Sequence, residues 1–128
     1  MRRERGAMSA LLLAIAGVVA LVAMMTAAVG VLLAEREHAA TAAEASALAA
    51  AVATYPLAGG GEPRQAAALY AAANGAHLIT CTCDVDDSMA RRTVVVTVGV
   101  EADIPMFGEV LVGRTARAEF DPVDWLGR

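Results

Sequence analysis

Lysine is absent from this chain, and aromatic residues are scarce, with one Trp, two Tyr and two Phe among 128 residues. The positive charge therefore comes from ten arginines, against 14 acidic residues. Beyond residue 34, seven arginines face thirteen acids, which gives a net charge of −6. A nucleic-acid or anionic-lipid surface calls for a basic footprint. This part of the chain therefore excludes both as partners.

Signatures of catalysis are also missing. The sequence contains no nucleophile elbow, phosphate-binding loop or HExxH motif. His77 stands near Cys81, Cys83 and Asp84, but this spacing matches no zinc pattern. Residues 84–88 lack the glycine and the distal glutamate of a calcium loop. We therefore expect no enzyme activity, no cofactor, no metal and no small-molecule substrate.

The strongest positive feature is an uncharged run of 29 positions, residues 6–34. As a helix it reaches about 44 Å, which exceeds the roughly 30 Å hydrocarbon core of a bilayer. Twelve of its residues are Leu, Ile or Val, giving an upper-bound insertion drive of ~4–7 kcal/mol. The run predicts a transmembrane helix over residues 7–34 and the lipid bilayer as a partner.

A cleaved secretory signal is the competing interpretation of this run. Signal peptides carry an apolar core of about 7–15 residues, roughly half the length found here, so we favour an uncleaved anchor. Arg2, Arg3 and Arg5 make residues 1–6 a basic tip, which the positive-inside rule places in the cytoplasm. The prediction is a single-pass protein of the cytoplasmic membrane with its C-terminal head outside.

The next segment, residues 35–55, predicts a helical stalk that continues the anchor. It contains no Gly or Pro, and ten of residues 39–53 are alanine, the best helix former. A stripe at spacings of four and three predicts the face that packs on the head. Its members are Thr41, Ala45, Leu48, Val52 and Tyr55. The alternative is a break near Glu35, with residues 41–44 as a capping box.

Residues 56–128 predict a small head. Pro56 and three glycines end the stalk, and a second helix runs from Pro63 to Ala73 with Asn74-Gly75 as its C-cap. A period of two then predicts strands over residues 78–85, 93–102 and 115–120. Three strands with one apolar face need a cover. The expected fold is α+β and pilin-like, a three-stranded antiparallel sheet packed on the stalk.

A small-residue seam lies within the anchor. Its members recur at spacings of four and three, so they share one helical face and allow another helix to approach closely in lipid. An alanine-rich helix also contains such seams by accident, but the opposite faces hold most of the leucines and valines. The seam consists of Ala16, Ala20, Ala23, Ala27, Gly30 and Ala34.

Cys81 and Cys83 are the only cysteines. On a regular strand these positions lie about 6.6 Å apart on one face, which is awkward for a bond between them. An even cysteine count in an exported chain nevertheless favours oxidation. Two buried thiols, a strained or bulged disulfide and a catalytic dithiol all stay open. We expect a structural role, because a reactive thiol needs exposure and a lowered pKa.

Several short motifs follow one another in a familiar order. The basic tip ends in Glu4-Arg5-Gly6-Ala7, and the stalk contains Ala42-Ala43-Glu44. A valine-rich hairpin follows the run Ala71-Ala72-Ala73-Asn74-Gly75-Ala76-His77-Leu78. In this order they resemble the TadE/TadG-like proteins of actinobacteria, pilin-related products of tight-adherence (Flp) pilus and secretion loci. The resemblance spans nearly the whole chain.

The chain departs from the family pattern at two places. Gly6-Ala7 is the candidate processing site, yet Leu11 stands where a type IV prepilin carries glutamate. The resemblance is also compatible with uncleaved members. Related sequences often place one cysteine at the start of the short helix, where this chain has Pro63-Arg64-Gln65. The family's usual bridge therefore cannot form, and a local or intermolecular bond is left open.

The resemblance implies a pilin-like structural subunit, a minor pilin or pseudopilin, that works by helix packing. Its implied partners are other pilin-like subunits or membrane proteins of the pilus or secretion system. One alternative is an anchored extracytoplasmic binding module that does not polymerise. A remote alternative is a thiol oxidoreductase that uses Cys81 and Cys83.

Overall fold

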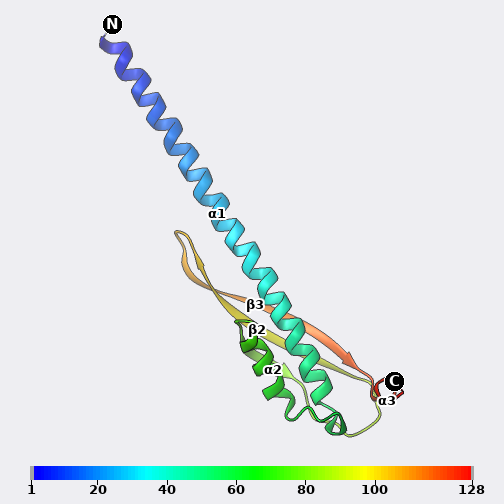
Figure 1. Ribbon diagram of the computed structural model, residues 1–128. Helices are drawn as coiled ribbons and strands as arrows, with labels where there is room; N and C mark the ends of the chain where they lie inside the picture. The colour runs from blue at the N-terminus through cyan, green and yellow to red at the C-terminus, as the bar shows by residue number, and fades with distance from the viewer. Residues whose placement is uncertain (1, 128) are drawn as a thin grey trace.

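The computed structural model describes residues 2–127, with side chains from residue 7 onward. Helices and strands are mixed, and the chain forms an α+β head at one end of a long helix (Figure 1). This confirms the predicted fold class. The elements in order are α1 (Arg2–Ala53), the 3₁₀ helix η1 (Pro56–Ala58), α2 (Pro63–Ala73), β1 (His77–Thr82), β2 (Arg92–Ile104), β3 (Gly108–Phe120) and α3 (Pro122–Leu126).

Helix α1 is continuous over 52 residues, about 78 Å at 1.5 Å per residue. The helix passes through Glu35 without interruption, so the alternative break there does not occur. Its most apolar 18-residue window has a mean hydropathy of 2.6, and only 6% of that window is buried. The core helix of a soluble protein would be mostly buried. By length and composition α1 can cross a membrane.

The sheet has the order β1-β2-β3, and both pairs are antiparallel. In the central strand β2 the even-numbered residues from Val94 to Ile104 are buried. Val96 and Val98 have no exposed surface. The predicted alternation of this strand is therefore confirmed, and it extends two residues further, to Ile104. These valines form the floor on which the helices pack.

The C-terminal half of α1 covers β2 and β3, while α2 packs between α1 and β1 (Figure 1). The surface that α1 turns toward the sheet is almost entirely alanine. Because alanine has the smallest apolar side chain, the helix backbone approaches the valine floor closely. The buried alanines of this face are Ala39, Ala42, Ala43, Ala47, Ala50, Ala51 and Ala53.

The stripe predicted as the packing face of the stalk is wrong for most of its members. Thr41 and Val52 are exposed, and Leu48 is 62% exposed. Only Tyr55, which follows the last turn, is buried, with 1% exposure. It lies beside Phe120, at a ring-centroid distance of 6.1 Å. The sheet already supplies bulky valines, so the helix meets it with its smallest side chains and leaves the larger ones outside.

The strand boundaries differ from the prediction in two places. Strand β1 ends at Thr82, and its register shifts at Ile79, which turns away from the face that holds Cys81. Strand β3 begins at Gly108 and pairs with β2 along its whole length. The sequence obscured this early part because Val112 packs toward α1 while Leu111 lies against Gly99 on the opposite face. Two apolar faces leave no alternation to detect.

Arg92 fastens the long connection between β1 and β2 to the end of α1. Its guanidinium donates hydrogen bonds to the backbone carbonyls of Thr54, Asp86, Ser88 and Ala90. It also lies 5.8 Å from the ring centre of Tyr55. Only 10% of the Arg92 side chain is exposed. One largely buried cation therefore holds four carbonyls, one after α1 and three in the β1–β2 connection.

Asp121 caps the short helix α3 at the end of the head. Its carboxylate accepts hydrogen bonds from the Val123 N–H (3.0 Å) and from Arg91 Nε (3.2 Å). Desolvation raises the pKa of Asp121, but the donors outweigh it and hold the pKa below its usual value. A lowered pKa means that this capping contribution is complete at neutral pH and is lost only as acid protonates the carboxylate.

Candidate functional site

The six members of the small-residue seam are all exposed on α1. A Cβ atom added at Gly30 would meet nothing within 4 Å. In the part of the chain that the structure describes, no element packs over the seam. The small-residue face of this part of α1 is therefore free for contact with another helix.

The seam lies on the side of α1 away from the head. At 100° per residue its centre is about 160° from the centre of the buried alanine face. The exposed stripe of the stalk falls at nearly the same angle as the seam. One face of mostly exposed residues therefore runs from residue 16 to the end of the helix, with Ala45 partly buried. We term it the outward face: Ala16, Ala20, Ala23, Ala27, Gly30, Ala34, Thr41, Ala45, Leu48 and Val52.

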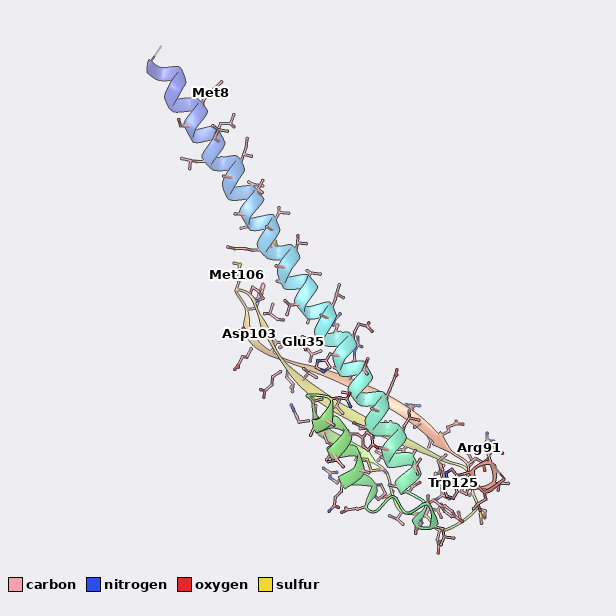
Figure 2. The ribbon with its side chains drawn as sticks, in the orientation of Figure 1. Met8, Glu35, Arg91, Asp103, Met106 and Trp125 are labelled. Carbon is pink, nitrogen blue, oxygen red and sulfur yellow. A yellow bond between two sulfur atoms is a disulfide. The ribbon has the colours of Figure 1, made fainter. Side chains whose placement is uncertain are left out.

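A shallow groove borders the outward face at the far pole of the head, where Trp125 and Arg91 lie (Figure 2). Leu48 and Val52 form its α1 side, and α3 forms the other. Charged side chains of both signs lie along the rim. The lining residues are Leu48, Val52, Arg91, Glu119, Phe120, Asp121, Asp124 and Trp125.

A second groove, of about 720 Å³, lies nearer the anchor between α1 and the β2–β3 hairpin. Its walls are mainly apolar, with two arginines in the lining. The lining residues are Ala28, Val29, Leu32, Arg36, Ile104, Phe107, Val110, Leu111, Val112, Gly113 and Arg114. No sequence pattern indicated this groove, because strand β3 was expected to begin only at residue 115.

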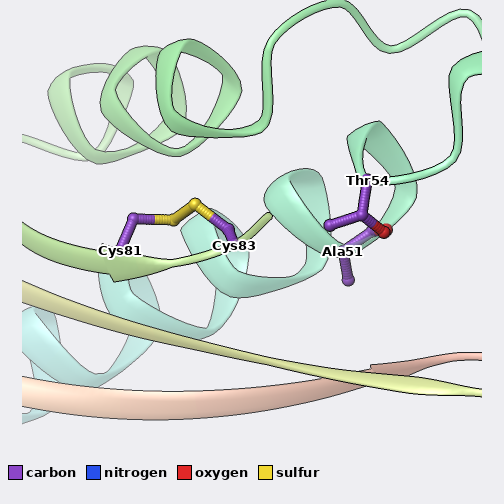
Figure 3. Close-up of a disulfide and its surroundings, with 4 residues drawn as sticks. All are labelled: Ala51, Thr54, Cys81 and Cys83. Atoms are coloured by element: carbon purple, nitrogen blue, oxygen red, sulfur yellow. A yellow bond between two sulfur atoms is a disulfide. The ribbon is translucent and has the colours of Figure 1, made fainter. Parts of the chain in front are cut away.

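The structure joins Cys81 and Cys83 in a disulfide (Figure 3). The bond is feasible because β1 ends at Thr82, so Cys83 has left the strand and the two Cα atoms are 5.4 Å apart. Both residues are partly buried against the core, near Ala51 and Thr54 of the α1 end. A position inside the packing between sheet and helix favours a structural role.

Replacing both cysteines by serine (C81S/C83S) tests this role. A three-residue closed loop contributes about 1–2 kcal/mol by chain entropy, so we expect a loss of this size in the free energy of unfolding. The measurement is urea unfolding of the full chain in detergent, followed by Trp125 fluorescence. A redox defect in cells with unchanged stability would instead support the oxidoreductase.

The other candidate residues do not assemble into a site. His77 lies against Gly99 in the sheet, and His38 lies beside Gly75. Among residues 7–127, whose side chains the structure describes, no three His, Cys, Asp or Glu side chains are grouped so that they could hold a metal ion. Ala7 of the candidate processing site is exposed. Side chains of the basic tip, residues 1–6 including Gly6, lie outside the described residues.

Comparison of the chain with protein-family models, with curated proteins and with solved structures found no match. The fold and its exposed surfaces are therefore the basis for the proposed function. Two of these surfaces were missed at the level of sequence. Leu48 and Val52 were assigned to the face that packs on the head, and no strand or surface was predicted for Met106 and Phe107.

Proposed function

We propose that this chain is a membrane-anchored, pilin-like structural subunit, a minor pilin or pseudopilin of a tight-adherence type pilus or a related secretion system. It acts through helix packing and head contacts, without chemistry of its own. One observation carries the proposal: the small-residue seam of α1 is exposed on the side away from the head, and mostly exposed residues continue along that side to Leu48 and Val52, which border the groove at the far pole. A subunit built in this way can pack its helix against neighbours while its head stays outside the bundle.

Residues 7–34 serve as the anchor in this proposal. The exposed apolar half of α1 crosses the cytoplasmic membrane once, with the basic tip in the cytoplasm and the head outside. The exposure of α1 supports this assignment. Only 6% of its most apolar window is buried, so packing against the head contributes little to the stability of this part of the helix. In the bilayer, those same side chains are in an apolar solvent.

The two halves of the outward face suit two different environments. Within lipid no hydrophobic drive exists between helices, so association depends on close backbone approach, which Ala20, Ala27 and Gly30 allow. Outside the membrane, water is present, and burial of Leu48 and Val52 is favourable. The change from small to larger side chains along one face therefore fits a neighbouring helix that passes from lipid into water. The implied partners are other pilin-like subunits or membrane proteins of the same machinery.

Crosslinking from the anchor tests this function. We expect a cysteine at Ala20 or Ala27 to give crosslinks to a membrane partner in native membranes, using a bifunctional maleimide that leaves the Cys81–Cys83 disulfide intact. Matched controls are Val18→Cys and Met25→Cys, which lie at the same depth on the opposite face of α1. Their yields should be several-fold lower. Absence of crosslinks from both seam positions would contradict the proposal.

A second candidate function is an anchored binding module that never polymerises. The groove at the far pole favours it, because Leu48, Phe120 and Trp125 offer apolar surface among charges of both signs. Shearing cells separates the two functions. The subunit proposal expects the protein in sheared filaments or in a complex with filament proteins, whereas the binding module stays wholly in the membrane fraction.

A further inference from the structure

The turn that joins β2 to β3 carries exposed apolar side chains. Met106 is 75% exposed and Phe107 is 73% exposed, and both follow Pro105 at the tip of the hairpin. Polar residues are the norm at such tips, because apolar ones face water at a cost. We term residues 104–108 the hairpin tip.

The hairpin tip lies beside the anchor and not beside the stalk. Figure 2 shows Met106 on the Met8 side of Glu35, the first charged residue after the apolar run. The groove beneath the hairpin is lined on its α1 side by Ala28, Val29 and Leu32. Ala28 precedes Glu35 by seven residues, about 10 Å along the helix axis. The hairpin therefore reaches back toward the membrane.

The length of the uncharged run places this tip relative to the bilayer. Twenty-nine residues span about 44 Å, whereas the hydrocarbon core needs only about 30 Å. If the core begins near Ala7, roughly 14 Å of apolar helix remains on the outer side. The hairpin tip runs along this excess, at the level of the outer leaflet and its headgroups. An apolar turn at that depth lies at the boundary between headgroups and acyl chains, where apolar side chains are buried away from bulk water.

We propose that the hairpin tip is a second membrane contact, with Met106 and Phe107 immersed in the outer leaflet beside α1. This proposal rests on the anchor assigned under the proposed function. The occupant of the exposed apolar surface is phospholipid, because the tip continues the apolar surface of the helix that crosses the bilayer. Insertion needs no basic footprint, so the acidic charge of the head is compatible with a zwitterionic leaflet.

Charged residues mark where the immersed region ends. Asp103 and Glu109 are paired across the hairpin, one step behind the Ile104–Gly108 pair. Their carboxylates stay in water, which limits immersion to the hairpin tip. Arg36 and Arg114 line the outer part of the groove, where their guanidinium groups are placed for lipid phosphates. Charged residues on α1 and on the hairpin therefore limit how far the hairpin tip enters the bilayer.

Two attachments restrict the head more than one does. A single helix leaves the head free to rotate about the helix axis relative to its neighbours and to tilt in the membrane. A second contact beside α1 fixes which way the sheet leans over the bilayer. The outward face, on the opposite side of α1, then keeps a fixed orientation toward neighbouring helices.

Single-tryptophan variants in phosphatidylcholine vesicles test this inference. Starting from Trp125→Phe, the variants carry Phe107→Trp, Met106→Trp or Leu13→Trp, and the unmodified chain reports Trp125 alone. Acyl-chain-brominated phosphatidylcholine quenches a tryptophan that touches lipid. We expect at least two-fold quenching at positions 106, 107 and 13, and none at Trp125.

The outcomes separate the tip from the anchor. Quenching at position 13 without quenching at 106 and 107 would overturn the hairpin contact and leave the anchor intact. Absence of quenching at position 13 would overturn the anchor and the proposed function together. Emission at 106 and 107 that is blue-shifted but insensitive to bromine would show a protein neighbour on the tip, which also contradicts the inference.

Discussion

Replacement of Arg92 by alanine is expected to destabilise the head by about 3 kcal/mol or more, since hydrogen bonds to charged groups contribute about 1.5–3 kcal/mol each. The guanidinium holds the carbonyls of Thr54 and Asp86 together with two carbonyls of the following loop. Without it these groups lose their donor, and Tyr55 loses the cation that lies over its ring. The measurement is urea unfolding of the full chain in detergent.

Two further variants keep this result interpretable. Arg92→Lys retains the charge but not the planar fork that reaches several carbonyls, so it should recover only part of the loss. Arg117→Ala removes an exposed arginine from β3 and should change the free energy of unfolding by no more than about 0.5 kcal/mol. An Arg92→Ala variant as stable as Arg117→Ala would contradict the role assigned to Arg92.

Enlarging the alanine face of α1 is the second change with a large expected effect. Ala47 is 1% exposed between the helix and the sheet. Ala47→Leu keeps a good helix former but adds three carbon atoms to a close-packed interface, which costs about 1–3 kcal/mol. Thermal unfolding of the full chain in detergent measures this loss.

The matched control for this variant is Ala49→Leu. Ala49 lies two residues away on the same helix and is only partly buried. The same added volume there has room toward solvent, so we expect a change below about 0.5 kcal/mol. Equal effects at the two positions would mean that the helix does not meet the sheet through the face that holds Ala47.

Much of the fold followed from patterns in the sequence. The alternation of Val94, Val96 and Val98 defined β2, because one face of an antiparallel sheet is buried and the other is solvated. Pro63 and Asn74-Gly75 delimited α2, and Gly75 adopts the left-handed conformation that such a helix end favours. The long helix was also expected. These sequence patterns are local, so they can be recognised without knowing which surfaces pack against each element.

The packing face of the stalk was not predictable in the same way. In a helix with so many alanines, every face is apolar enough to be buried, and the larger Leu48 and Val52 drew the assignment to the wrong side. The true face depends on volume across the interface: β2 supplies valines, so α1 supplies alanines. This match of side-chain volumes belongs to the tertiary structure, and a helical periodicity of 3.6 residues does not reveal it.

The candidate site was predicted in part. The small-residue seam from Ala16 to Ala34 was identified from its spacing, but its continuation through Leu48 and Val52 depended on the corrected packing face. The hairpin tip was hidden because the first residues of β3 are apolar on both faces. Both omissions have one cause: exposed apolar residues resemble core residues until the core is known.

Crosslinking at Leu48 tests most directly the central claim, that one face of α1 packs against a neighbour along its whole length. The measurement compares Leu48→Cys with Leu69→Cys, an equally exposed leucine on α2, in native membranes with the same bifunctional maleimide. We predict that Leu48→Cys gives crosslinks to the partner that Ala20→Cys and Ala27→Cys capture, and that Leu69→Cys gives several-fold less. Crosslinks from the anchor positions with Leu48→Cys no higher than Leu69→Cys would contradict the claim.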